Sequence, residues 1–60
     1  MTVTFRDRHD YTELRVVDVL RCEFEIITRG KPFRFWAVTK NSGEVVRFDK
    51  MRYNILSVAD

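Results

Sequence analysis

The sequence predicts an all-β domain, a small antiparallel SH3-like or Sm-like barrel of about five strands with a long bent second strand. Two turn signals, at residues 28–31 and 40–43, each contain a glycine and separate segments of extended character. Apolar and polar residues alternate along much of the chain, as expected of half-buried strands. With 60 residues, the chain forms a single domain, 1–60, whose core must be thin.

Composition limits the possible functions. Eleven basic and nine acidic residues give a net charge of +2, which permits a nucleic-acid or acidic partner without requiring one. Cys22 is the only cysteine and His9 the only histidine, so we expect no internal disulfide, no zinc site and no cofactor. Because Met1 is followed by a polar stretch rather than an apolar signal sequence, we expect a cytoplasmic protein with no membrane partner.

The first strand is predicted at residues 2–6, and a polar break follows it. Asp7, His9 and Asp10 in that break could hold a metal or act as acid and base. No other ligand in the sequence completes such a site, so a polar turn between strands is the favoured interpretation.

Residues 11–20 are open to two interpretations. Asp10 and Glu13 have capping-box spacing, which is compatible with a helix. Period-2 alternation from Leu14 to Ile26 fits better, and it predicts one long strand or two abutting strands, bent at Asp18. We expect the Asp18 carboxylate to bond the local backbone at a bulge, although a carboxylate with a perturbed pKa is the alternative.

Two hairpins follow in the sequence. A two-residue first turn and a four-residue second loop place Phe24, Phe35 and Phe48 in one row across three strands. Cys22 then lies on the same apolar face as a buried small hydrophobe. A three-residue second loop, pairing Lys40 with Glu44, is the competing register. We prefer the first register because it gives one apolar and one charged face.

The polar face of this meander is the predicted binding site. In the preferred register Arg34 lies between Glu25 and Asp49, and Trp36 lies between Glu23 and Arg47. Such a face could simply be solvated and stabilised by ion pairs. An exposed tryptophan with arginine neighbours also has the composition of an interface hot spot. The predicted docking residues are Trp36, Arg34, Arg47, Val38 and Val45.

The chain ends with a short polar passage at residues 50–54, which could form one helical turn, and a last strand at residues 55–58. Pro32, after the first turn, indicates a frayed or edge position there.

Nucleic acid is the alternative partner. Trp36 or Tyr53 could stack on a base, whereas Glu23, Glu25 and Asp49 on the Trp36 face would repel a phosphate backbone. The residues that could neutralise phosphates are Arg6, Arg8, Arg15, Arg21, Arg29, Lys31, Arg34, Arg47, Lys50 and Arg52.

The segment FWAVTKNSGEVVRFDKM, residues 35–51, resembles the strand–turn–strand segment of WYL domains. Residues 35–37 match the Trp-Tyr-Leu-type strand, with the Tyr and Leu replaced, and residues 47–51 match the later Arg-Leu-Asp-Arg-Ile-type strand. The resemblance implies an Sm-like barrel core of the kind found in bacterial regulators that are thought to bind ligands or nucleic acid. The helix-turn-helix that accompanies such domains has no counterpart in this sequence.

We therefore expect a small non-enzymatic binding module, a regulator or inhibitor that docks a protein or a second copy of itself through the Trp36 face. A small nucleic-acid-binding barrel is the alternative. An enzyme is not expected, because no nucleophile and base have a recognisable motif.

Overall fold

The structure of the protein is a computed structural model that describes residues 1–28, 30 and 32–60. The strands are β1 (Thr2–Asp7), β2 (Glu13–Val16), β3 (Val19–Thr28), β4 (Pro32–Lys40), β5 (Val45–Asp49) and β6 (Tyr53–Ala59). Within the described part of the chain there is no helix long and apolar enough to cross a membrane.

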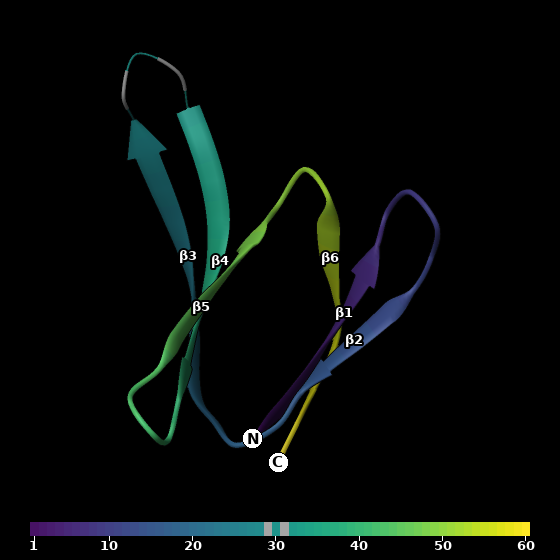
Figure 1. The fold of residues 1–60 in the computed structure, drawn as a ribbon, viewed down its shortest axis with the longest axis vertical. Helices are drawn as coiled ribbons and strands as arrows, with labels where there is room; N and C mark the ends of the chain where they lie inside the picture. Colours follow the sequence, from purple (N-terminus) through teal and green to yellow (C-terminus); the bar gives the residue numbers. More distant parts are fainter. Residues whose placement is uncertain (29, 31) are drawn as a thin grey trace.

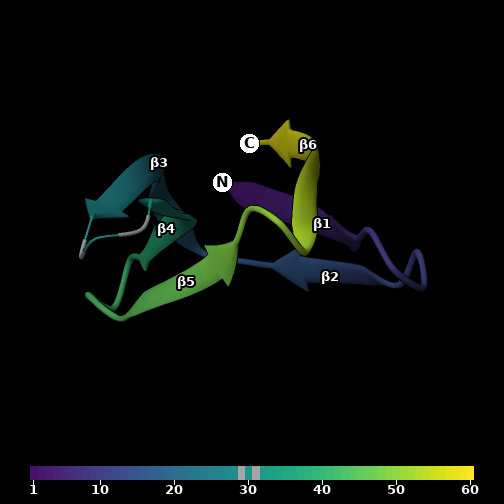
Figure 2. The same cartoon turned by 90° about the horizontal axis from the view of Figure 1, so that it is seen from above.

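The strands form two antiparallel three-stranded sheets (Figure 1). One has the order β2-β1-β6 and the other the order β3-β4-β5. Figure 2 shows the two sheets next to each other, with both termini between them. The all-β prediction is confirmed, with six strands rather than about five. The pairings observed among the described residues do not close a barrel.

The predicted long bent strand is divided into β2 and β3 at Val17 and Asp18. Asp18 has a φ of 56°, in the left-handed region that aspartate tolerates better than most residues. Its carbonyl accepts the Asn41 N–H at 2.8 Å, and the Val19 N–H donates to the Met1 carbonyl at 2.8 Å. Among the described residues the Asp18 side chain makes no hydrogen bond, so the expected side-chain bond is wrong and the backbone holds the bend.

The preferred register of the meander is wrong for β4. Phe24 pairs with Trp36, not with Phe35, and Trp36 pairs with Phe48. The second loop has three residues, as in the competing register, and Gly43 adopts a φ of 92° in it. The first turn also holds three residues, because Thr28 pairs with Pro32. Its residues 29 and 31 lie outside the described residues, whereas Pro32 begins β4 at an edge position, in the part of the strand that has no β5 partner.

Each predicted turn is therefore wrong by one residue. The two errors cancel between β3 and β5, so their faces are as predicted, but they exchange the two faces of β4. Phe24 and Phe48 keep their common face, while Trp36 and Val38 replace Phe35 and Ala37 on it. The charges on the other face pair without Arg34. Arg47 on β5 donates its Nε–H to Glu25 on β3 at 3.0 Å, across the strand that carries Ala37. Because alanine is small, it leaves room for an ion pair to span β4.

The core lies where the two sheets meet. Val3 and Phe5 of β1 pack with Val19 of β3 and Val38 of β4, and all four are buried. The Phe5 and Phe48 rings stack with centroids 4.2 Å apart, which joins the sheets. As predicted, Cys22 behaves as a small hydrophobe: it is partly buried against this core, and burial raises the pKa of its thiol.

The end of the chain is more extended than predicted. Residues 50–52 form a turn in which the Asp49 carboxylate accepts the Met51 N–H at 2.8 Å, and β6 begins at Tyr53. At the C-terminal end of β1 the alternation of buried and exposed residues also runs further than expected. Asp7 is the last residue of this strand and is only 4% exposed.

Candidate functional site

The predicted docking residues do not share a surface. Trp36 and Val38 face the core side of β4, where Val38 is fully buried, and alternation places Arg34 on that same face. Arg47 and Val45 lie on the opposite face of the sheet. The single Trp/Arg face expected from the sequence is therefore wrong, because it depended on the position of β4.

Trp36 has a packing role at the edge of the core. Its ring packs against the buried cluster and meets the Phe24 ring edge-on, with centroids 5.4 Å apart. Its Nε1 is buried and finds no acceptor in the described part of the chain. Trp36 is thus partly buried rather than exposed, and the apolar surface continues outward from it through Phe24.

This surface belongs to a part of the β3–β4 hairpin that extends beyond its neighbours, as Figure 1 shows. The last residue of β4 paired with β5 is Phe35, opposite Asp49. Beyond it the sheet has only two strands. We call this two-stranded part, together with the two adjoining rows in which Phe35 and Trp36 still pair with β5, the β3–β4 ribbon (residues 24–27 and 33–36).

Both faces of the ribbon are apolar and exposed. On the core side, Phe24 is 40% and Ile26 58% exposed; on the outer side, Ile27 is 37% and Phe33 50% exposed. The Phe33 ring stacks with that of Phe35, with centroids 6.4 Å apart. A two-stranded ribbon has marginal stability by itself, and contiguous exposed apolar surface of this kind marks interaction sites.

Cationic groups border the core side of the ribbon. The Lys50 Nζ lies over the Phe24 ring, 4.7 Å from its centroid, and Arg34 lies on the same face. The sequence reasoning found Arg34 but missed Ile26, Ile27 and Phe33. In the sequence, apolar residues occupy both even and odd positions of these segments. This pattern indicates a strand with two apolar faces rather than one apolar and one polar face.

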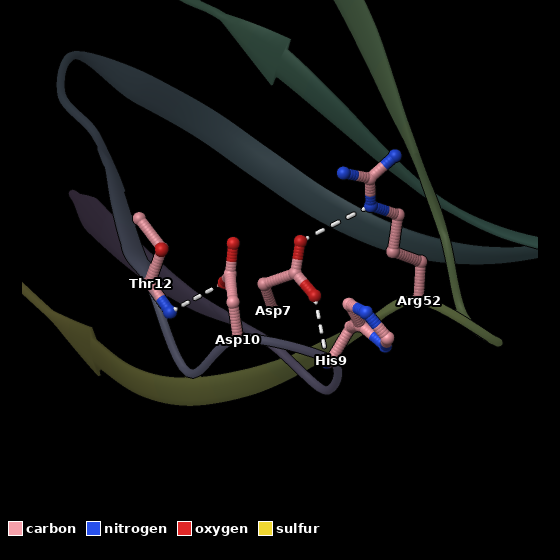
Figure 3. Close-up of polar contacts among 5 residues, drawn as sticks. All are labelled: Asp7, His9, Asp10, Thr12 and Arg52. Atoms are coloured by element: carbon pink, nitrogen blue, oxygen red, sulfur yellow. Dashed lines mark hydrogen bonds and ion pairs between the residues drawn. The ribbon is translucent and has the colours of Figure 1, made fainter.

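A second candidate site lies at the end of the other sheet and contains the predicted Asp7, His9 and Asp10 cluster (Figure 3). Asp7 Oδ1 accepts the His9 N–H at 2.7 Å, and Asp7 Oδ2 accepts the Arg52 Nε–H at 3.1 Å. Asp10 Oδ1 accepts the Thr12 N–H at 2.9 Å. The carboxylates therefore order the turn, and in the described ranges no three metal-binding side chains converge.

These hydrogen bonds fix the charge of the cluster. The His9 N–H, and then the Arg52 guanidinium, lower the pKa of Asp7 despite its burial. The Thr12 N–H lowers the pKa of Asp10 in the same way. Bonding to Asp7 raises the pKa of Arg52. At neutral pH the cluster thus holds ionised carboxylates and an ionised guanidinium.

Next to this cluster, Arg8, His9, Met51 and Arg52 line a cavity of about 520 Å³. Arg8 is held by Asn54, whose Oδ1 accepts from Nε at 2.9 Å and from Nη2 at 2.7 Å. Arg52 also borders a smaller cavity of about 180 Å³. A cationic hollow and an apolar ribbon are therefore the two candidate sites.

Comparisons with protein-family models, curated proteins and solved structures gave no match.

Proposed function

We propose that the protein is a small non-enzymatic binding module, a regulator or inhibitor, that docks a protein partner through the β3–β4 ribbon. The observation that supports this most is the exposure of large apolar side chains on both faces of the ribbon, with Ile26 58% and Phe33 50% exposed. Water contact with such groups is unfavourable by about 25 cal/mol per Å², which a partner would remove.

The partner is expected to make main-chain contacts as well. The sheet order β3-β4-β5 leaves β3 at an edge, where alternate residues direct their backbone groups away from β4 and Val19 bonds to Met1. An exposed apolar edge strand accepts an added strand from another chain. A separate protein or a second copy of this chain could supply that strand, and the homodimer is the simplest form of the second case.

We propose that the fold is related to SH3-like or Sm-like barrels and is an open form of one. Support comes from the strand order, in which the first strand pairs with the last and the second strand continues through a bend into the other sheet. The resemblance of residues 35–51 to WYL domains is part of this proposal, as is a cytoplasmic location.

The test is a pair of ribbon substitutions. Ile26→Ser together with Phe33→Ser removes one exposed apolar group from each face, and capture of the partner from the source cells should be lost. Val58→Ser is the matched control, because Val58 is 55% exposed on the other sheet. Capture that survives the ribbon variant, or that is lost equally in the control, contradicts the proposal.

Nucleic acid binding is the second candidate, and the cavity lined by Arg8, His9 and Arg52 supports it. Glu23, Glu25 and Asp49 no longer count against it, since they lie on the outer face of the other sheet. Binding of an oligonucleotide at low salt that weakens steeply with added salt would favour this candidate over the first.

A further inference from the structure

Two guanidinium groups are held in fixed orientations beside the same cavity. Asn54 accepts two hydrogen bonds from Arg8, one from Nε and one from Nη2, on a single oxygen. Asp7 accepts one from the Nε of Arg52, and Asp7 is itself fixed by the His9 N–H. Because both arginines are already oriented, a ligand would lose little side-chain entropy on binding them.

Each arginine keeps donors that no described residue uses. Arg8 retains Nη1, and Arg52 retains both terminal nitrogens. Figure 3 shows the terminal nitrogens of Arg52 directed away from Asp7. Arg52 is also well exposed, with 65% of its side chain in contact with solvent.

The lining of the cavity has the charge to bind an anion. Its residues are two arginines, a histidine and a methionine, and none is a carboxylate. Asp7 is 4% exposed and bonds Arg52 from the protein side, so it orients the guanidinium without entering the cavity lining. Met51 is 77% exposed and offers an apolar contact. The volume of about 520 Å³ falls in the range of small-molecule sites, roughly 300–1,000 Å³.

We propose that this cavity binds the phosphate group of a phosphate ester, with Arg8 and Arg52 as donors to different oxygens. Guanidinium groups match phosphate geometry and form charge-assisted hydrogen bonds that are about twice as strong as neutral ones. A phosphate has enough terminal oxygens to accept from both arginines at once. Arg8 follows β1 and Arg52 precedes β6, at the end of the sheet that does not contain the ribbon, and the inference does not depend on that docking surface.

The test follows the arginine Nε–H signals of the isotope-labelled protein by NMR during titration with inorganic phosphate at constant ionic strength. Saturable shifts are expected for Arg8 and Arg52 and not for Arg21, which pairs with Glu23 elsewhere at 3.4 Å. Arg8→Gln should weaken phosphate binding about tenfold or more, whereas Arg21→Gln, a matched loss of one charge, should change it less than about twofold.

Two further variants separate geometry from charge and from folding. Asn54→Ala keeps every charge but releases Arg8, and should weaken binding by several-fold. Arg52→Lys keeps a cation opposite the buried Asp7, which protects the fold, but lacks the fork that contacts two oxygens. If the Arg8 and Arg21 variants bind phosphate equally, or if none of the phosphate ligands tested saturates the two signals while the protein is folded, the proposal is overturned.

The source of the phosphate is distinguished in the same experiment. A nucleoside monophosphate and a short single-stranded oligonucleotide are titrated beside inorganic phosphate. Equal affinity for the nucleoside monophosphate and the oligonucleotide indicates a small-anion site. Much tighter binding of the oligonucleotide, with the same arginine shifts, indicates a nucleic-acid phosphate. Both outcomes support the phosphate site, and failure of all three ligands contradicts it without bearing on the ribbon.

Discussion

Asp7 joins three parts of the chain through one carboxylate. Its oxygens accept from the backbone of the following turn and from Arg52, 45 residues further along. Both interactions favour the ionised form, so the pKa of Asp7 in the folded protein lies below its ordinary value of 3.8. The ionised carboxylate therefore contributes to stability.

This contribution predicts the direction of acid unfolding. Because the folded-state pKa is depressed, the stabilisation is present above the ordinary pKa of 3.8, which applies in the unfolded chain, and is lost as pH falls through the folded-state pKa. Urea unfolding should show lower stability below pH ~4 than at pH 7. Asp7→Asn should remove part of this dependence, and Asp60→Asn, at the exposed C-terminus, should leave it unchanged.

Tyr11 carries backbone strain. Its φ is 64°, which is unfavourable for a bulky side chain, and 71% of the residue is exposed. Tyr11→Gly should be more stable than Tyr11→Ala by roughly 1 kcal/mol in chemical unfolding, since both remove the ring and only glycine relieves the left-handed backbone. Equal stability of the two variants would show that this position is not strained.

At the scale of elements, the sequence predicted where strands run but not how β4 is registered against its neighbours. Period-2 alternation and the two turns predicted extended segments where the structure has strands, and the bend at Asp18 was predicted as well. Turn length decides register, and the glycine in each turn is compatible with more than one turn length. Strand β4 has apolar residues on both faces, so its own pattern could not correct the error.

The wrong register followed from an assumption about the two faces of the sheet. We preferred the pairing that gives one apolar and one charged face, and that pairing placed Arg34 between Glu25 and Asp49. The structure pairs Glu25 with Arg47 across Ala37 instead. In the observed register Trp36 faces the core, and the ribbon carries exposed apolar side chains on both faces.

A double-mutant cycle can test the register directly. Glu25→Gln and Arg47→Gln should show a coupling energy of about 0.5 kcal/mol, the usual size for a partly exposed ion pair, and added salt should reduce it. The control cycle of Glu25→Gln with Arg34→Gln should show no coupling. Coupling in the control cycle alone would restore the register with Phe24 opposite Phe35.

At the scale of the molecule, the core depends on a few aromatic contacts between the sheets. Phe5 is fully buried and stacks on Phe48. Phe5→Ala should cost about 3–5 kcal/mol, which is close to the whole stability of a domain this small. Circular dichroism should therefore show a largely unfolded chain. Phe33→Ala, at a residue 50% exposed on the ribbon, should remain folded.

The candidate sites could be predicted only in part because they depend on strand register and sheet order. Arg34 was predicted as a docking residue and lies within the ribbon. From the sequence, Arg8 and Arg52 were recognised only as members of a set of basic residues, because 44 positions separate them. Only the pairing of β1 with β6 brings the end of β1 next to the start of β6, and the two arginines with them. Sites made by distant strands require the sheet order, which local patterns do not contain.

The most direct test of the proposed docking ribbon is site-specific photo-crosslinking in the source cells. A photoreactive phenylalanine analogue replaces Phe33 on the ribbon in one version of the protein and Val58 on the other sheet in a second version. We expect the Phe33 position to crosslink to a protein, either another chain or a second copy, and the Val58 position to give no such product. A crosslink from Val58 alone, or equal products from both positions, would contradict the account.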